Sequence, residues 1–330
     1  MSDETWDPVL YTEHADLTAG TPFVSLWSYQ SQRRQRAFPP VRVTSNGSRE
    51  YWLQRTDPLL TNVLPGTHVS IVMNLSDRWE LGSSDGHTHH VSRVSVFGPA
   101  VRPRRLRLGR TVCALGVVFS PAFTDAFLGV PAPWLRDQVL DLEDLWSRER
   151  VEGVHEAVRT VEVPMGVALL RTLLLRAPPP PPRRMEEAAV RFLVSAGGHP
   201  SIEATCRHFG VSRQCLARRF GETVGLSPKL FARITRFQAL VPALLVTDVK
   251  EWASLATPAG FCDQAHMINE FRAFAEVAPT TFFRPPGTTD TRRLRGAPSQ
   301  WGTAEGHEAP EDARPGTLLP TPSLHHQVER

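Results

Sequence analysis

The 330-residue sequence has no long apolar run and little cysteine. No stretch approaches the ~20 consecutive apolar residues that a membrane-spanning helix requires, so we expect a protein that does not cross a membrane. The N-terminal stretch MSDETWDPVLYTEH is acidic and has no apolar core, which predicts no secretory signal and a cytoplasmic protein. The four cysteines show no metal-binding or redox spacing, and we interpret them as reduced thiols that suit a reducing cytoplasm. They are Cys113, Cys206, Cys215 and Cys262.

The sequence also lacks a catalytic constellation, so we expect no enzyme and no cofactor. The apolar fraction of 41% and the charged fraction of 22% are globular values, and the length suffices for two domains. A formal net charge of +3 is too small to identify a partner. The distribution of charge along the chain must therefore do so.

Proline and composition divide the chain. A proline run at 177–184 cannot form a helix or a sheet ladder, and we interpret it as a stiff linker. A proline-rich ligand for another protein is the alternative interpretation. The predicted parts are a flexible N-terminus (1–17), a β-rich sensor or dimerisation domain with trailing helices (18–176), the linker (177–184), a helical domain (185–284) and a disordered tail (285–330).

Short β-type runs separated by turn signals predict an antiparallel sandwich or barrel before the linker. The run at 68–75 is almost continuously apolar, as expected of a central strand. The remaining predicted strands are 23–27, 49–54, 91–97, 104–109 and 112–119.

Helical spacing follows the last of these strands. A short helix begins at Ser120 and Pro121. Apolar residues at helical spacing continue through 134–146 and 147–176, where Pro164 ends or kinks a helix that resumes at 167. These helices either pack on the sheet or pair between subunits.

After the linker, one pattern occurs twice. Each copy has a small residue, a glycine four positions later and a polar residue that can start a helix, and the turn is one residue longer in the second copy. A small residue, a turn glycine and a capped helix are what a helix-turn-helix needs, because two short helices cross closely there. The residues are Cys206, Gly210 and Ser212, then Ala256, Gly260 and Asp263.

In the first copy, Ser212 caps a helix whose buried face carries Leu216 and Phe220. Arginine can bind guanine bidentately, glutamine can pair with adenine, and alanine permits close approach to a base. The opposite face therefore suits a major groove, with a phosphate contact at its side, although a solvated helix face is the alternative. Its residues are Arg213, Gln214, Ala217 and Arg218, with Arg219 at the side.

The second copy has the same geometry. Asp263 caps it, and Met267, Phe271 and Phe274 face inward. Gln and Asn on the outer face could read adenine, and the isoleucine either contacts a thymine methyl or packs on the domain. The outward residues are Gln264, Ala265, Ile268, Asn269 and Arg272.

Charge separates the two copies. Seven basic and two acidic residues between positions 201 and 236 give +5, whereas three basic and five acidic residues between 237 and 284 give −2. Because phosphate neutralisation supplies most non-specific DNA affinity, we expect the first copy to carry most of the binding.

The segments GVSRQCLARRFGETVGLSPKLFARITRFQ and WASLATPAGFCDQAHMINEFRAFAEVAPTTFF resemble the DNA-binding domain of the AraC/XylS family of transcription regulators. The resemblance covers about 185–284 and includes a GF-D-Q-x-H signature. It implies two helix-turn-helix units joined by a long helix, with recognition helices in successive major grooves ~34 Å apart. The β-rich block resembles the family's sensor or dimerisation region.

Three residues depart from the family pattern. Asn269 stands where Arg or Lys is usual, Glu276 where Gly is usual, and Pro242 interrupts the connecting helix. Proline in a helix interior costs ~3 kcal/mol or more, so the helix kinks or a new one begins there. We therefore expect weak or context-dependent DNA binding by the second unit.

Two clusters offer rival sites in the β-rich block. His87, His89 and His90 could hold a metal in a cupin-like barrel, but no glutamate follows them as the cupin pattern requires, and a solvated hairpin tip is the preferred interpretation. A basic cluster forms either one exposed strand face, which we favour, or a site for an acidic ligand. It contains Arg102, Arg104, Arg105 and Arg107.

The sequence thus predicts an α+β multidomain protein, with a β-rich (cupin-like or sandwich) domain before an all-α double helix-turn-helix domain. The predicted function is a sequence-specific, DNA-associated bacterial transcription regulator in the cytoplasm, modulated by a ligand or partner at the N-terminal domain. Double-stranded DNA is the predicted partner, and a small-molecule effector, a homodimer and RNA polymerase are further candidates. A metal-dependent cupin-like enzyme fused to a DNA-binding domain is the alternative.

Overall fold

A computed structural model describes most of both predicted blocks. The expectations for the N-terminus (1–17), the proline run and the tail (285–330) fall largely or wholly on residues outside the described ranges, and Arg184, the last residue of the predicted linker, begins a helix. The described residues are 9–14, 23–31, 41–43, 49–53, 61–82, 88–109, 111–176, 184–246 and 251–282.

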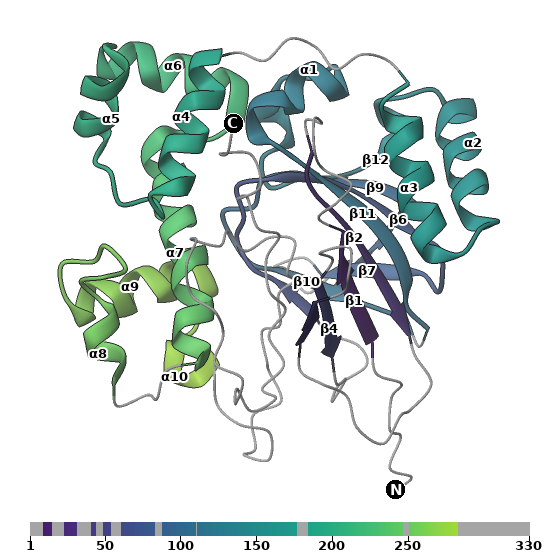
Figure 1. Cartoon of the computed structure of the whole chain (residues 1–330), viewed down its shortest axis with the longest axis horizontal. Helices are drawn as coiled ribbons and strands as arrows, with labels where there is room; N and C mark the ends of the chain where they lie inside the picture. Colours follow the sequence, from purple (N-terminus) through teal and green to yellow (C-terminus); the bar gives the residue numbers. More distant parts are fainter. Residues whose placement is uncertain are drawn as a thin grey trace, which may run out of the picture.

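The N-terminal block contains two antiparallel sheets (Figure 1). The eight-stranded sheet has the order β12 (Val139–Asp141), β9 (Val94–Phe97), β6 (Val69–Asn74), β11 (Cys113–Phe119), β2 (Phe23–Ser31), β1 (Val9–Glu13), β4 (Arg49–Leu53), β3 (Val41–Val43). The four-stranded sheet has the order β5 (Thr61–Val63), β10 (Arg104–Arg107), β7 (Trp79–Gly82), β8 (Thr88–Val91). The prediction that 68–75 is a central strand is confirmed, because β6 lies between β9 and β11 and is buried throughout.

Strand alternation builds one core on each face of the large sheet. Successive side chains of a strand point to opposite faces, and β11 follows this period of two. Ala114 and Val118 join Trp27 and Trp79 in a cluster between the two sheets. Leu115, Val117 and Phe119 join the cluster on the other face.

Helices α2 (Arg148–Arg159) and α3 (Val163–Leu174) cover that other face (Figure 1). Of the two expectations for these helices, packing on the sheet is therefore what the fold adopts. Pro164 lies in the first turn of α3, where the missing N–H costs nothing, so the helix begins at Val163 and not at 167.

Two sequence predictions in this block are wrong in detail. The predicted strand 91–97 is two strands, because the chain bends after Val91 and Ser95 Oγ donates to the Ser92 carbonyl at 3.0 Å. The segment 134–146 is no helix. It forms the 3-10 helix η3 (Ala132–Leu135), strand β12 and the 3-10 helix η4 (Leu142–Asp144), because its residues 139–141 pair with the edge of β9.

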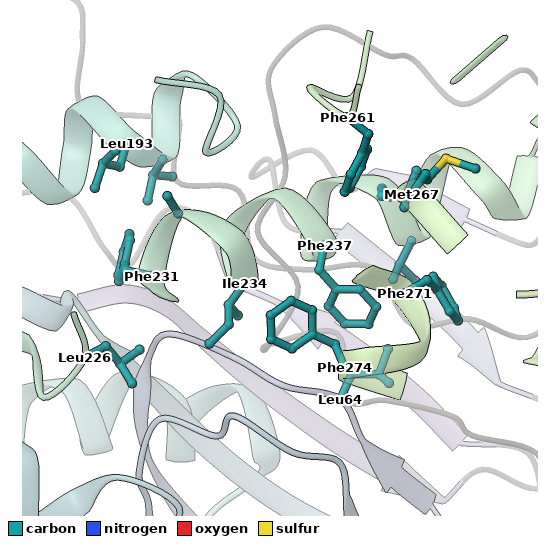
Figure 2. Packing of buried hydrophobic residues seen from close by; sticks show 14 of the residues in the cluster. Leu64, Leu193, Leu226, Phe231, Ile234, Phe237, Phe261, Met267, Phe271 and Phe274 are labelled. Atoms are coloured by element: carbon teal, nitrogen blue, oxygen red, sulfur yellow. The ribbon is translucent and has the colours of Figure 1, made fainter. Parts of the chain in front are cut away.

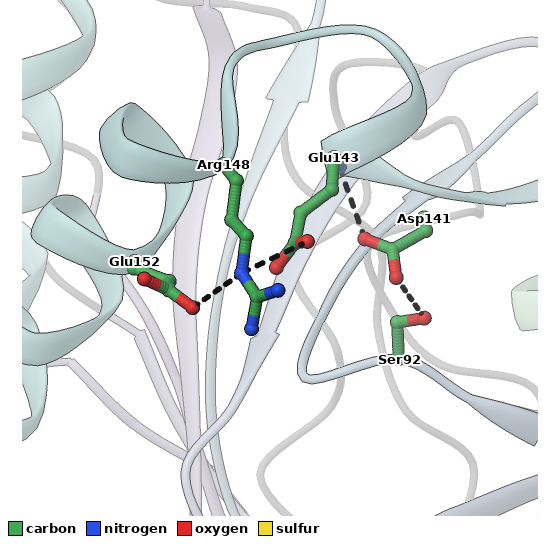
Figure 3. A network of polar contacts seen from close by, with 5 residues as sticks. All are labelled: Ser92, Asp141, Glu143, Arg148 and Glu152. Atoms are coloured by element: carbon green, nitrogen blue, oxygen red, sulfur yellow. Dashed lines mark hydrogen bonds and ion pairs between the residues drawn. The ribbon is translucent and has the colours of Figure 1, made fainter.

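Asp141 fixes this segment to its neighbours (Figure 3). One carboxylate oxygen accepts a 2.6 Å hydrogen bond from Ser92 Oγ, and the other caps η4 by accepting from the Glu143 amide at 3.0 Å. Arg148 then bridges Glu143 and Glu152 at 3.8 and 2.7 Å. The β8–β9 bend, β12 and the start of α2 are thereby joined.

Past the proline run, the described residues are helical, as predicted. The helices are α4 (Arg184–Ser195), α5 (Ile202–Phe209), α6 (Arg213–Val224), α7 (Pro228–Val246), α8 (Trp252–Leu255), α9 (Gln264–Ala275) and α10 (Pro279–Phe282). The long helix α7 separates α4–α6 from α8–α10 (Figure 1). Among the described helices none is both long and apolar enough to cross a membrane.

The helical block has its own hydrophobic core around α7 (Figure 2). Phe231 and Phe237 of α7 make edge-to-face ring contacts with Phe220 of α6 and Phe271 of α9, at centroid distances of 5.2 and 5.4 Å. The same cluster includes Leu64 and Ala122 of the N-terminal block. The two blocks therefore pack on each other.

Gly116 offers a test of the core between the sheets. A Cβ at this position would overlap the indole of Trp27, which lies opposite Gly116 in the β2–β11 register. Gly116→Ala should lower the free energy of unfolding by about 1–3 kcal/mol, measured by urea denaturation. Gly153→Ala is the matched control, since Gly153 is exposed on α2 with open space around it, and alanine should stabilise that helix by about 0.5–1 kcal/mol. A loss of stability in both variants would contradict this account.

Candidate DNA-binding surface

The first unit, α5–turn–α6, turns at Gly210. This glycine has a φ of 63°, in the left-handed region that L side chains rarely adopt. Its amide donates to the Arg207 carbonyl, and the Val211 amide donates to the Cys206 carbonyl, which satisfies the last carbonyls of α5. Ser212 then caps α6 by accepting from the Cys215 amide at 3.2 Å, so the predicted cap is confirmed.

The second unit, α8–turn–α9, repeats these bonds. Gly260 has a φ of 77°, its amide donates to the Thr257 carbonyl at 3.0 Å, and the Phe261 amide donates to the Ala256 carbonyl at 2.9 Å. Asp263 Oδ1 accepts from the His266 amide at 2.7 Å and so caps α9. The internal repeat predicted from the sequence is thus a repeat of backbone geometry.

Helix α6 presents the predicted outward face to solvent. Leu216 and Phe220 are fully buried, as predicted, whereas the outward residues are exposed. The structure brings together on this face Arg213, Gln214, Ala217 and Arg218.

Ion pairs hold two of these arginines without covering them. Arg213 Nη2 lies 2.6 Å from Glu203 of α5, and Arg218 Nη1 lies 3.5 Å from Glu222 one turn later. Both guanidinium groups stay well exposed. Because exposed pairs contribute little, about 0–1 kcal/mol, a nucleic-acid phosphate or base can displace either carboxylate.

Arg219 pairs with a carboxylate inside the domain, and its predicted phosphate contact stays a prediction. Its Nε and Nη2 donate to the two carboxylate oxygens of Glu186 on α4 at 2.6 and 3.2 Å. Glu186 is only 4% exposed, and the hydrogen bond to it raises the pKa of Arg219. A bidentate pair of this kind fixes α6 on α4. Sequence spacing could not reveal it, since Glu186 stands 33 positions away.

On α9, Met267, Phe271 and Phe274 are buried, as predicted. Ile268 is half-buried, which is compatible with both of its predicted roles, contact with a thymine methyl and packing on the domain. Glu270 is bound bidentately by Arg233 of α7, with both distances 2.8 Å. The exposed outward residues are Gln264, Ala265, Asn269 and Arg272.

The charge difference between the units is smaller than the sequence sum implies. Arg219 and Arg233 neutralise acidic partners inside the domain, and Arg236 donates to the Gly198 carbonyl at 2.9 Å. Arg207 and Lys229, which the sequence analysis did not assign to the site, are exposed and make no ion pair with any described residue. Their positions in the last turn of α5 and the first turn of α7, beside α6, are the signal that could have found them.

The connecting helix α7 runs as one helix from Pro228 to Val246. No new helix begins at Pro242, so one of the two predicted outcomes is wrong. A proline inside a helix still removes one backbone hydrogen bond. The packing of Phe237, Leu240 and Leu244 in the common core holds the helix on either side of Pro242.

Most of the described residues of the two rival clusters in the N-terminal block are exposed. His89 and His90 lie exposed on β8, the edge strand of the small sheet, and His87 is outside the described residues. Within the described ranges, no group of three or more His, Cys, Asp or Glu is arranged to hold a metal.

The basic cluster on β10 splits between two environments. Arg105 and Arg107 are exposed, but Arg104 is 8% exposed, so the prediction of one exposed face is wrong for Arg104. Burial lowers the pKa of Arg104 to about 10, against the opposing effect of Asp137, and the side chain stays charged at neutral pH. Its Nη1 donates to the Gly98 carbonyl at 3.1 Å, whereas Nη2 is buried without a partner among the described residues.

Two family models match the chain. Residues 205–285, which span both helical units, match a family described as a helix-turn-helix domain, and residues 48–141 match a domain of unknown function, DUF6597. The C-terminal block is therefore a DNA-binding domain of the helix-turn-helix class. It is of the AraC type, as the sequence predicted.

Solved structures show only distant similarity. ToxT from Vibrio cholerae is 12% identical with a TM-score of 0.39, over 68% of this chain and 93% of that chain. ToxT with a bound unsaturated fatty acid is 12% identical with a TM-score of 0.38, over 72% and 95%. The AraC-like transcriptional activator CuxR is 18% identical with a TM-score of 0.24, over 66% and 76%. These TM-scores are too low to carry a functional argument. No curated protein matches the sequence.

Glu276 gives a test of the second unit. It ends α9 with a φ of 60°, the left-handed conformation that glycine adopts without strain. Glu276→Gly should therefore stabilise the helical domain by about 1 kcal/mol, measured by urea denaturation. Glu276→Ala is the control, because it removes the carboxylate but keeps the Cβ. Equal stabilisation by both variants would assign the effect to charge and contradict the strain.

Proposed function

We propose that this chain is a sequence-specific DNA-binding transcription regulator whose first helix-turn-helix unit supplies most of the affinity. The observation that carries the proposal is the outward face of α6, a capped helix whose opposite face is buried. This outward face carries two exposed arginines, a glutamine and an alanine. A recognition helix enters the major groove with its N-terminal residues on the base edges. Arg213, Gln214, Ala217 and Arg218 lie in the first half of α6 and meet that requirement.

Each residue of this face has a role by its chemistry. Arg213 and Arg218 can each donate bidentately to guanine, Gln214 can pair with adenine, and Ala217 lets the helix approach a base closely. Ser212, whose side chain is committed to the cap, stands at the N-terminal end of α6, the end of a recognition helix that suits contact with a phosphate. Arg207 and Lys229 flank α6 with exposed charges that suit phosphates.

The second unit offers fewer cations for the same task. On α9, Gln264 and Asn269 can read adenine, and Arg272 is the one outward-facing cation among the described residues of this helix. Ala265 permits close approach, and the exposed part of Ile268 suits a thymine methyl. Because most affinity comes from phosphate neutralisation, α9 should refine specificity more than it adds binding energy.

The N-terminal block is proposed to take a small effector with an anionic group. Support comes from buried hydrogen-bonding atoms that lack a partner among the described residues: Arg104 Nη2, Trp79 Nε1 and His68 Nε2. Burial lowers the pKa of His68 to about 4, so its imidazole is neutral at pH 7, and Arg104 supplies the charge. An unmet buried donor is costly, by about 1–3 kcal/mol, and an acceptor that reaches it recovers that energy. A homodimer and a contact with RNA polymerase stay predictions of the family resemblance, since no described contact bears on them.

The effector proposal predicts a selective thermal shift. A panel of small carboxylates, each paired with its neutral amide, should contain at least one acid that raises the melting temperature by a few degrees more than its amide. Arg104→Met should abolish that difference, whereas Arg107→Met, on the exposed face of the same strand, should keep it. A shift that persists in Arg104→Met would remove Arg104 from the site.

The DNA proposal predicts unequal losses from the two units. Arg218→Ala should weaken binding to a DNA duplex selected by the wild-type protein about 5- to 150-fold, the range for one bidentate base contact. Asn269→Ala should weaken it less than about fivefold. Fluorescence anisotropy at fixed salt measures both, with Arg159→Ala as the control, because Arg159 is another well-exposed arginine, on α2, that pairs with Glu156. Equal losses for Arg218→Ala and Asn269→Ala would contradict the assignment.

A further inference from the structure

The 3-10 helix η3 lies between the large β-sheet and the recognition helix α6. Its terminal residues Ala132 and Leu135 are each 1% exposed. Leu135 belongs to the core on the α2–α3 side of the sheet, and the backbone of Ala132 lies against the C-terminal end of α6. One short segment therefore contacts both blocks of the protein.

At the end that contacts the sheet, η3 is held by backbone contacts that leave no space for a side chain at Gly98. A Cβ on Gly98, just after β9, would overlap the Leu135 carbonyl. The Gly98 amide donates to the Gln138 carbonyl at 3.0 Å, and the Asp137 amide donates to the Pro99 carbonyl at 2.7 Å. These bonds make η3 follow the end of β9.

At the end of η3 that contacts α6, a second glycine leaves room for the backbone of η3. Gly225 closes α6 with a φ of 78°, and its amide donates to the Gly221 carbonyl at 3.0 Å. A Cβ there would lie 2.5 Å from the Ala132 carbonyl oxygen. The flanking residues Val224 and Leu226 are buried, at 2% and 1% exposure, in the hydrophobic core of the helical block.

We propose that η3 is a strut that positions the recognition helix α6 and carries displacements of the β9 end of the sheet to it. The inference rests on the proposed function, since it concerns how the DNA-reading helix is controlled. Two features support it. The contact is made at the C-terminal end of α6, so the outward face stays free for DNA while the strut is in place. The Gly98 carbonyl at the other end accepts from the buried Arg104, which links the strut to the interior between the sheets.

A double-mutant cycle on the full-length chain tests the strut. Gly98→Ala forces η3 away from the sheet, and Gly225→Ala forces it away from α6. Hydrogen exchange is followed at the amides of Val224 and Gly225, and DNA affinity is measured on a duplex that spans two successive major grooves. Gly98→Ala should speed exchange at the end of α6 about tenfold and change the dissociation constant about three- to tenfold. The double variant should change both by less than the product of the single effects, because a strut displaced at one end no longer acts at the other.

The chain supplies matched controls. Gly129 and Gly210 have φ values of 76° and 63° and open space at the Cβ position, so alanine there imposes the same backbone strain without displacing η3. Gly129→Ala should leave exchange at the end of α6 unchanged, and its effects should multiply with those of Gly225→Ala. Gly210→Ala controls for strain within the first unit itself. If Gly98→Ala does not fold by circular dichroism, Asp137→Gly replaces it, because glycine keeps the left-handed conformation and removes the acceptor for the Val101 amide.

The outcomes separate the strut from the proposed function. Unchanged exchange at Val224 and Gly225 in the sheet-side variant, or effects that multiply fully, would overturn the strut even if the wild-type protein binds DNA. Exchange that responds without any change in DNA affinity would overturn the positioning of α6. A wild-type protein that does not bind the duplex would overturn the proposed function, while the exchange data would still decide whether η3 couples the two blocks.

Discussion

Packing of α6 and α9 on α7 is the constraint on which the candidate DNA-binding surface depends. Phe220 of α6 and Phe271 of α9 each set a ring edge-to-face against a phenylalanine of α7, and such pairs contribute about 0.5–1.5 kcal/mol beyond the area they bury. Because one helix receives both contacts, α7 sets the separation and rotation of the outward faces of α6 and α9, which are the two faces proposed to read DNA. An interior proline in α7 is tolerated since tertiary packing outweighs one lost backbone bond.

The helix-turn-helix units were predictable because their determinants are local. A turn glycine, a capping residue and apolar residues at matched offsets specify each unit within about twenty positions, and the geometry agrees at Gly210, Gly260, Ser212 and Asp263. The features that the sequence did not reveal have the opposite cause. Arg219 binds a carboxylate 33 positions away, and residues 139–141 pair with the edge of β9 although their spacing predicted a helix. Both features depend on long-range partners, which local spacing does not encode.

The contrast between the two units lies more in placement of charge than in its amount. Four exposed cations lie on α6 or beside it in the first unit: Arg207, Arg213, Arg218 and Lys229. Arg219, Arg233 and Arg236 instead make contacts inside the domain. Arg233 neutralises the acidic Glu270, so Glu270 adds little negative charge to the surface of the second unit. What distinguishes α9 is therefore its scarcity of outward cations. This scarcity supports the proposal that α9 contributes less phosphate affinity and contacts bases through Gln264 and Asn269.

Gly225 illustrates why coupling between the blocks is invisible in the sequence. A glycine after α6 is expected on local grounds alone, because helices commonly end on a left-handed residue. That local explanation does not account for the contact between Gly225 and η3. Gly210 and Gly129 meet the same local requirement with open space around them. Only the fold separates a glycine that serves a helix end from one that also admits a neighbour. A cap and a close interdomain contact at one residue make the end of α6 sensitive to small movements of η3, since packed contacts respond to displacement in discrete steps.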